Sequence, residues 1–347
     1  MRSKTYKSPS TFRTTSNNNR GGSQRALLVL PILAGVLSCL ACGGTQAPKT
    51  IEPPLTNRSN AKLWSIGIAQ GPDLLTLSER SVPTNPVLSW RDIRHPDVAF
   101  VADPFLIRRN STWHLFFELF NTKSGRGELG VASSADLSSW RFEKVVLAEP
   151  FHLSYPFVFE HEDTYFMIPE SRQAHGIRLY RATNFPLSWT LERELISGDY
   201  SDPSPVFFQG RWWIFACKSP YSLAIFYAND LRGPWHEHAK SPFYVDDKGL
   251  ARPGGRPVVV NGQLVRFVQD NREGYGKKVR AMVVDTLTPT EFAEHPADRD
   301  PFFAPHGDHW ARNGMHHISP VQREDKTWVA AIDGNGDGLP ELPTPHQ

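Results

Sequence analysis

Residues 155–170 read YPFVFEHEDTYFMIPE, and other stretches of the chain follow the same plan. Each copy begins with one residue followed by a proline and continues with an apolar run, a short polar turn and an aromatic run. Most copies end on a polar residue. Close copies are 103–118 (DPFLIRRNSTWHLFFE) and 202–217 (DPSPVFFQGRWWIFAC), and looser ones cover 256–270 and 319–333. The prolines of successive copies are 52, 47, 54 and 63 residues apart. Such a period indicates a repeat architecture.

A second signature follows the first three copies: an apolar strand, an alanine, a short turn and a tryptophan (Trp140, Trp189 and Trp235). The fifth copy lacks this half, but a matching pattern occurs near the start of the body, at 66–74 and 88–90. Aromatic runs between polar turns are typical of β-hairpins. We therefore expect an all-β fold, a five-bladed β-propeller closed by N-terminal strands in the last blade. The alternative is a β-sandwich with accidental internal similarity.

Composition and charge exclude several classes of protein. Of the 347 residues, 39% are hydrophobic and 12% aromatic, which excludes a disordered chain. The formal net charge is +2, yet six basic residues lie within the first 25 positions and the first acidic residue is Glu52. Without that basic segment, 38 − 6 = 32 basic residues face 36 acidic ones. This mildly acidic body argues against nucleic acid or an anionic membrane as a partner.

The N-terminal segment predicts export. A basic, polar stretch precedes the apolar run 26–42, and small residues surround Cys39 and Cys42. We expect an export or lipoprotein signal over 1–42 with lipidation at Cys42 (or Cys39), a linker at 43–60, the propeller at 61–338 and a tail at 339–347. An ordinary signal peptide or an uncleaved signal anchor are the alternatives. The predicted location is the bacterial cell envelope, with the anchor as the only membrane contact. Cys217 would be a buried, inert thiol.

The propeller geometry brings acidic residues from separate copies together. In a blade, the first strand begins and the second ends at the same face, so the polar residues at both ends of each copy gather around one mouth. A pair of carboxylates there is suited to acid–base chemistry on glycosidic bonds. We predict Asp103, Glu170 and Asp202 as catalytic residues. The predicted substrate-binding residues are Glu118, Tyr155, Arg252, Arg256 and His317. The alternatives are that aspartates before proline cap turns and that the arginines neutralise neighbouring carboxylates.

No metal or cofactor is expected. Histidine occurs at 306, 309, 316 and 317, but the adjacent pair His316 and His317 would face opposite sides of a strand. The segment 333–338 (DGNGDG) matches the front half of a calcium loop, but Thr344 stands at the twelfth position, where an acidic ligand is needed. A glycine-rich terminal turn is the better interpretation of that segment.

Several motifs carry a family resemblance: VADPFLI (101–107), FHLSYPFVFE (151–160), MIPES (167–171) and GMHHIS (314–319). With them, 102–334 resembles the N-terminal domain of plant glucosamine inositolphosphorylceramide transferase, a domain also attached to bacterial sugar formyltransferase-like proteins. That domain is similar in turn to the five-bladed propellers of glycoside hydrolase family 43. In those hydrolases the first blade provides an aspartate base, which Asp103 matches. Tyr155 stands where an aspartate tunes the acid, and Asp202 where a glutamate is the acid.

The resemblance limits the function that we expect. The plant transferase has a separate glycosyltransferase domain after the propeller, and this sequence ends at Gln347, so transferase activity is not implied. We expect an exported carbohydrate-active propeller that acts on or binds a glycan or glycolipid head group, by glycoside hydrolysis or transfer if it is catalytic. The alternatives are a non-catalytic sugar-binding module and a scaffold without enzymatic activity.

Overall fold

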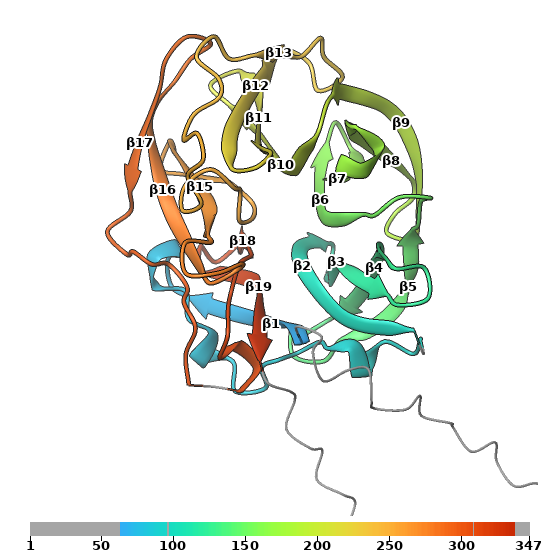
Figure 1. Cartoon of the computed structure of the whole chain (residues 1–347). Coiled ribbons are helices and arrows are strands. Elements are labelled where there is room, and N and C mark those ends of the chain that lie inside the picture. The colour runs from blue at the N-terminus through green and yellow to red at the C-terminus, as the bar shows by residue number, and fades with distance from the viewer. Residues whose placement is uncertain (1–62, 96, 308, 337–347) are drawn as a thin grey trace, which may run out of the picture. The chain divides into compact units, whose positions relative to one another are not determined.

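The computed structural model describes residues 63–336 except positions 96 and 308. Over these residues the chain forms five antiparallel sheets arranged around one centre (Figure 1). The all-β, five-bladed propeller expected from the repeat is confirmed. The predicted signal, linker and tail, with Cys39 and Cys42, lie outside the described residues.

Four blades follow one another along the chain, each with four strands. Blade 1 contains β2 (Val98–Arg109), β3 (Thr112–Asn121), β4 (Arg126–Ser134) and β5 (Arg141–Leu147). Blade 2 contains β6 (Ser154–His161), β7 (Thr164–Glu170), β8 (Gly176–Asn184) and β9 (Ser188–Ser197). Blade 3 contains β10 (Tyr200–Phe208), β11 (Arg211–Lys218), β12 (Ser222–Ala228) and β13 (His236–Glu237). Blade 4 contains β14 (Val258–Val260), β15 (Gln263–Asp270), β16 (Lys278–Leu287) and β17 (Phe292–Pro296).

Blade 5 joins the two ends of the described chain. It contains β18 (Ile318–Gln322) and β19 (Trp328–Gly336), and the N-terminal strand β1 (Leu63–Gly71) pairs with β19 along its whole length. The second N-terminal pattern contributes only a bridge between Leu88 and Ile66 rather than a strand. The predicted closure of the last blade by an N-terminal strand is thus confirmed, and the edge of β19 is covered.

The described helices are all three-residue 3-10 turns: η2 (Leu74–Thr76), η3 (Glu79–Ser81), η4 (Trp90–Asp92), η5 (Arg172–Ala174) and η6 (His309–Ala311). No described helix is long and apolar enough to cross a bilayer.

Both faces of a blade are buried, which explains the continuous apolar runs in the sequence. On β3, Phe116 packs into the cluster shared with blade 2, whereas Leu115 and Phe117 pack on the opposite side with strands of blade 5. Successive side chains of a strand point to opposite faces. An apolar run such as LFF therefore serves two inter-blade interfaces at once.

The recurring tryptophans stabilise the turn that leads into the outermost strand of blades 1, 2 and 3. The indole nitrogens of Trp140, Trp189 and Trp235 donate to the carbonyls of Leu137, Pro186 and Leu231, at 3.0, 2.9 and 3.1 Å respectively. Each ring is half-buried. The tryptophan thus pairs its N–H while covering the blade edge with apolar surface.

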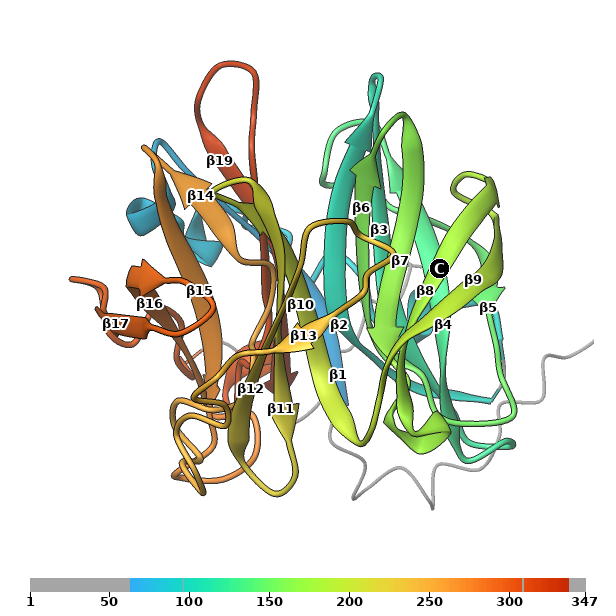
Figure 2. The same ribbon diagram turned by 90° about the horizontal axis from the view of Figure 1, so that it is seen from above.

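Seen from the side, the long strands run between the two faces of the ring (Figure 2). Because β2 and β3 are antiparallel, as are β6 and β7 and β10 and β11, the starts of the first strands and the ends of the second strands meet at one face. We call this face the mouth. The tight turns between first and second strands lie at the opposite face.

Candidate functional site

The mouth holds a cavity of about 250 Å³. This is somewhat below the usual range for drug-sized ligands and suits one small polar group such as a sugar ring. We call it the mouth pocket. It is lined by Trp64, Phe100, Ala102, Asp103, Glu118, Phe120, His152, Ser154, Glu170, Arg252, Tyr275 and His316. These residues come from strands or loops of blades 1, 2, 4 and 5.

A repeated β-bulge places the first residue of each close copy. Asp103, Tyr155 and Asp202 have φ angles of 51°, 49° and 53°, and strand pairing shifts register at each of them. A left-handed backbone costs a non-glycine residue about 1 kcal/mol or more. Its recurrence at three equivalent places marks it as a constructed feature that bends the strand and redirects the side chain. The aspartates before proline, Asp103 and Asp202, therefore lie in β-bulges. They do not cap turns, which was the alternative interpretation of the aspartate–proline pattern.

Carboxylates of second strands accept hydrogen bonds from the amides of two of these bulges. Asp333 of blade 5 accepts from the Asp103 N–H at 3.1 Å, and Glu170 of blade 2 accepts from the Asp202 N–H at 3.2 Å. Glu118 has the corresponding place in blade 1, but its Oε1 faces His152 Nε2 at 3.5 Å. The acidic residues of blades 5 and 2 thus support the first strands of blades 1 and 3. Sequence reasoning found these residues by their spacing but missed this role.

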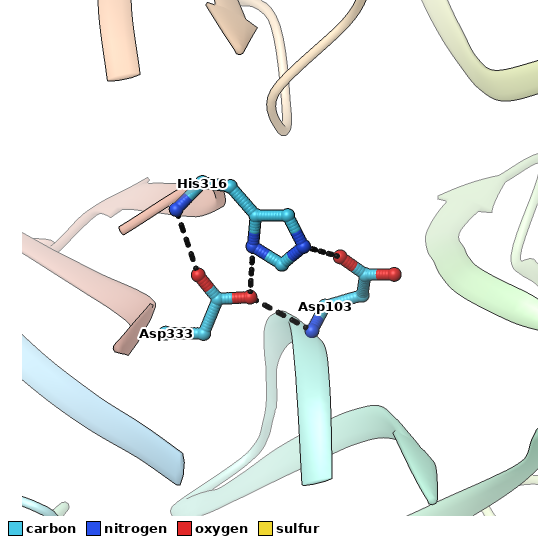
Figure 3. A group of neighbouring side chains, drawn as sticks. All are labelled: Asp103, His316 and Asp333. Atoms are coloured by element: carbon cyan, nitrogen blue, oxygen red, sulfur yellow. Dashed lines mark hydrogen bonds and ion pairs between the residues drawn. The ribbon is translucent and has the colours of Figure 1, made fainter. Parts of the chain in front are cut away.

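Asp103, His316 and Asp333 form a buried triad (Figure 3). Asp333 pairs through Oδ2 with His316 Nδ1 at 2.7 Å, and its Oδ1 accepts from the backbone N–H groups of His316 and His317. The other ring nitrogen of His316, Nε2, faces Asp103 Oδ1 at 3.6 Å. One imidazole therefore lies between two carboxylates of different blades.

A second buried network surrounds Arg252. Its Nε donates to Asp202 Oδ2 in a short contact, and its Nη2 lies 3.9 Å from Glu170 Oε2. Gln269 Nε2 donates to the same oxygen of Asp202 at 2.9 Å. Asp202 is 1% exposed and does not line the mouth pocket. Its carboxylate is therefore held behind the pocket wall by Arg252 and Gln269.

Burial sets unusual protonation states for the lining carboxyls. It raises the pKa of Asp103 to about 7, although the positive charge of His316 acts in the opposite direction. Burial and the charge of Asp202 raise the pKa of Glu170 to about 8, and Arg252 opposes the shift. The pKa of Glu118 lies well above its usual range because of burial and the charges of Asp103 and Glu170. Carboxyls with such values can donate or accept protons near neutral pH.

The pKa values of His316 and Asp333 are shifted in the directions that favour the charged form of each side chain. Burial alone would raise the pKa of Asp333, but the charge of His316 and its hydrogen bond hold that pKa below its usual value. Burial disfavours the imidazolium of His316, but Asp333 and Asp103 raise the pKa of His316 above its usual value. Each member of this pair, joined by the 2.7 Å contact, therefore favours the charged form of the other.

Three predicted substrate-binding residues lie outside the pocket lining. Tyr155 is fully buried, and its hydroxyl contacts Ser204 Oγ and both backbone polar groups of Gly255 at 2.7–2.9 Å. Arg256 donates to the Val158 carbonyl at 2.7 Å and lies over the Phe157 ring. His317 is fully buried against Tyr155. We call these three residues the floor; their direct contact with a ligand stays a prediction.

Glu118 and Arg252, the other two predicted binding residues, do line the mouth pocket, as do Asp103 and Glu170 of the predicted catalytic set. Sequence reasoning missed the aromatic walls. Phe100 and Phe120 stack with their ring centroids 5.3 Å apart, and Trp64 stacks on His316 at 4.0 Å. Residue 64 belongs to the closing strand β1, so only the ring closure brings it here.

Other details differ from the sequence expectations. His316 and His317 precede β18 rather than lie on a strand, so both rings approach Asp103 instead of facing opposite ways. Asp270, the polar residue at the end of the fourth copy (256–270), pairs with Arg272, and its neighbour Gln269 donates to Asp202. The segment 333–336 is the end of β19 and not a turn. Cys217 is buried and free, and burial raises the pKa of its thiol to about 11.

The triad is also a group whose potential metal-binding atoms all lie within 4.8 Å of one another. A metal needs the free lone pair of a neutral imidazole nitrogen. Here Nδ1 of His316 is engaged by Asp333, and the pKa of His316 is raised, so the ring holds a proton at that position. The other ring nitrogen, Nε2, is directed at Asp103. We describe Asp103, His316 and Asp333 as a carboxylate–histidine triad.

Solved structures with a similar fold are carbohydrate-active enzymes. A putative glycosidase from Bacteroides thetaiotaomicron matches with a TM-score of 0.54 at 12% identity, over 68% of this chain and 86% of that one. A glycosyl hydrolase from Bacteroides ovatus has the same TM-score at 15% identity, over 72% and 91%. An exo-β-1,3-galactanase from Clostridium thermocellum reaches 0.50 at 14%, over 60% and 51%. At these identities the likeness concerns the fold.

Curated relatives from plants are much closer in sequence. Glucosamine inositolphosphorylceramide transferase 1 of rice (Oryza sativa subsp. japonica) is 42% identical over 247 residues, 68% of this chain and 33% of the relative. The Arabidopsis thaliana protein of the same name is 32% identical over 300 residues, 80% of this chain and 39% of the relative. This chain thus matches between a third and two-fifths of their length.

These relatives contradict the predicted location. The expectation of a bacterial cell-envelope lipoprotein rested on the residues around Cys39 and Cys42, whereas the named relatives are plant proteins and point to a eukaryotic protein. A basic and apolar leader followed by cysteine is a short, weakly specific pattern, so it carries less information than similarity across most of the chain.

The family comparison covers the whole described body. The model for glucosamine inositolphosphorylceramide transferase 1, N-terminal, matches residues 60–335, which run from just before β1 almost to the end of β19. The match therefore includes all five blades and every residue of the mouth pocket and the triad. This carbohydrate-related propeller belongs to the glucosamine inositolphosphorylceramide transferase 1 N-terminal domain family.

Proposed function

We propose that the mouth pocket binds a sugar residue of a glycan and that its carboxyls perform acid–base chemistry on the glycosidic bond. One observation carries the proposal: Asp103, Glu118 and Glu170, from two blades, line a single small pocket and have raised pKa values. The aromatic side chains beside them offer apolar faces for a sugar ring. Protonated and ionised carboxyls together are what glycosyl hydrolysis and transfer require.

The roles follow from the surroundings of each carboxyl. Glu170, whose pKa is about 8, is protonated at neutral pH and donates its proton to the oxygen of the departing group. Asp103, whose pKa is about 7 and which faces the imidazolium of His316, accepts the proton of the attacking hydroxyl. Asp202 touches Arg252 rather than the pocket, so we assign it the positioning of Arg252 and Glu170.

The substrate class that we propose is the glycosylated head group of a lipid. The names of the plant relatives specify glucosamine and an inositolphosphorylceramide, a sugar and a phosphate-containing lipid. A pocket of about 250 Å³ suits one terminal sugar of such a head group. The propeller of residues 61–338 is the unit that would bind it.

The experiment is a panel of glycosides and glycolipid head groups tested for turnover and binding. Wild type should turn over at least one member, and Asp103→Asn and Glu170→Gln should lower kcat by about 10²–10⁴-fold while binding persists. Glu162→Gln, an exposed carboxylate at the opposite face, is the matched control and should keep full activity. Equal turnover by Asp103→Asn and wild type would overturn the proposed chemistry.

A non-catalytic sugar-binding module is the second candidate. It is favoured by the departure from the hydrolase pattern: Asp202 is closed off by Arg252 and Gln269, and Tyr155 is part of the floor. In that case wild type binds a member of the panel without turning over any of them. Asp103→Asn and Glu170→Gln would then weaken binding, and neither variant would turn over any member of the panel.

A further inference from the structure

The strongest unassigned feature is the way in which the ring of His316 is fixed. Its Nδ1 pairs with Asp333 at 2.7 Å, its face stacks on Trp64 with centroids 4.0 Å apart, and the edge of Tyr275 packs against it at 5.4 Å. His316 is 2% exposed and Asp333 is fully buried. The imidazole is therefore held on three sides, and Nε2 is directed at the Asp103 carboxylate.

Asp333 is itself fixed by the backbone around it. Its two oxygens accept from the N–H groups of Asp103, His316 and His317 at 3.0–3.1 Å, in addition to the contact with the His316 ring. Three amides from two blades thus converge on one carboxylate. A carboxylate with so many donors stays ionised and keeps the opposing Nδ1 of His316 protonated.

From this geometry we propose that His316, anchored by Asp333, is a positioning residue that holds a positive charge against the Asp103 carboxylate and so keeps Asp103 available as the proton acceptor. The proposal rests on the proposed function of the mouth pocket. In the reaction, the oxygen of the attacking hydroxyl bonds to the anomeric carbon as the bond from that carbon to the departing oxygen breaks. The proton of the attacking hydroxyl passes to Asp103, and Glu170 gives its proton to the departing oxygen. His316 makes no contact with the reacting atoms and acts through Asp103 alone.

The charge of His316 matters because most other groups around Asp103 oppose ionisation. The titratable and charged groups that face Asp103 come from all five blades: Glu118, Glu170, Asp202, Arg252, Tyr275, His316, His317 and Asp333. The carboxylates Asp202 and Asp333 raise the pKa of Asp103, whereas His316 and Arg252 lower it. Arg252 is already paired with Asp202, so His316 is the cation nearest to Asp103.

The test is a pH titration of the full chain by NMR, with ¹³C labels in the aspartate carboxyls and the histidine rings. In His316→Gln, the midpoint of Asp103 should rise by about one to three pH units, because an opposite charge within 4–6 Å is removed. In Asp333→Asn, the midpoint of His316 should fall, because the anion at Nδ1 is lost. His175→Gln, which breaks an exposed pair with Asp199 on the same face, is the matched control and should leave Asp103 unchanged.

The catalytic readout uses the substrate found in the glycan panel. In His316→Gln, the acidic limb of the kcat/KM profile should move to higher pH by the same amount as the Asp103 midpoint. The pH range of activity should become narrower, because Glu170, whose pKa is about 8, loses its proton as Asp103 becomes ionised. A uniform loss of rate at every pH, with the Asp103 midpoint unchanged in a folded variant, would overturn the proposal. If the NMR midpoints move as expected but no glycan is bound, the proposed function fails and the electrostatic role of His316 stands.

Discussion

At the scale of single residues, Arg252 determines how the acidic mouth is stabilised. Its guanidinium pairs with the buried Asp202 and approaches Glu170, and its side chain is 19% exposed. From the sequence alone, this arginine could bind a ligand or neutralise its neighbours. The contacts show neutralisation, and binding stays a prediction for a residue that also lines the mouth pocket.

We expect Arg252→Gln to lower the free energy of unfolding by about 3–5 kcal/mol, because it leaves the Asp202 carboxylate buried without its cation. Urea denaturation measures the change. Arg272→Gln removes an arginine that is 58% exposed and paired with Asp270, and should cost less than about 1 kcal/mol. Adding Asp202→Asn to Arg252→Gln should restore part of the loss. Equal effects of the two arginine variants would contradict the buried-pair interpretation.

Because the pKa values of Asp103 and Glu170 are raised, we expect the protein to become less stable as the pH rises. Their pKa values rise from 3.8 to about 7 and from 4.5 to about 8. Between about pH 4 and 8 the native chain therefore holds protons that the unfolded chain has released, so the free energy of unfolding falls as pH rises through this window. The urea midpoint should be lower at pH 8 than at pH 5. Asp103→Asn combined with Glu170→Gln should reduce this slope, and an unchanged slope would refute the assignment.

At the scale of elements, blades 4 and 5 meet at a backbone contact that only glycine permits. Gly255 forms a parallel bridge with Ile318 and has a φ of 139°. A Cβ at Gly255 would lie 1.8 Å from the Ile318 carbonyl oxygen. The same glycine bonds the Tyr155 hydroxyl through its N–H and C=O. One position therefore joins three blades beneath the mouth pocket.

Gly255→Ala should destabilise the protein by about 3 kcal/mol or more, since it combines a left-handed backbone with a collision against main-chain atoms. Gly262→Ala is the matched control: its φ is 81°, but nothing lies within 4 Å of the added Cβ. We expect that control to cost about 1 kcal/mol. Thermal and urea unfolding of both variants measure the difference, and similar losses would show that the close approach is not rigid.

At the scale of the whole molecule, the ring depends on a strand from the other end of the sequence. β1 pairs with β19 from Leu63 opposite Gly336 to Gly71 opposite Trp328. Ile66 and Ile68 of β1 are fully buried in the cluster that also holds residues of blade 1. Closure therefore joins blades 5 and 1, whose junction contains Asp103, His316 and Asp333.

A chain that begins at residue 73 should lose cooperative unfolding and aggregate, because the edge of β19 and the apolar faces of two blades become exposed. A chain of residues 61–338 should unfold cooperatively with the midpoint of the full chain, which also tests the proposed domain bounds. Near-UV circular dichroism and thermal melts of the two chains provide the comparison. A cooperative, soluble chain starting at 73 would show that closure by β1 is dispensable.

The repeat in the sequence was sufficient to predict the blades and their closure, because period, turn chemistry and strand patterning are local properties. It was also sufficient to gather Asp103, Glu118 and Glu170 at one mouth, since antiparallel strands of known order place their ends at one face. It could not place Trp64 or Tyr275 at the pocket, because neither belongs to the repeated pattern. Nor could it separate Asp202 from Asp103, which have the same position in their copies but different neighbours.

By itself, then, the sequence determined the architecture, five antiparallel sheets in a closed ring with an acidic face, because each sheet is encoded by contiguous residues. Only the tertiary structure decided which acidic groups face the cavity, which are neutralised and which histidine is charged. Those properties arise from contacts such as Asp333 with Asp103 and Arg252 with Asp202, which are 230 and 50 residues apart. Burial and the distance between charges set protonation, and neither quantity exists before the ring closes.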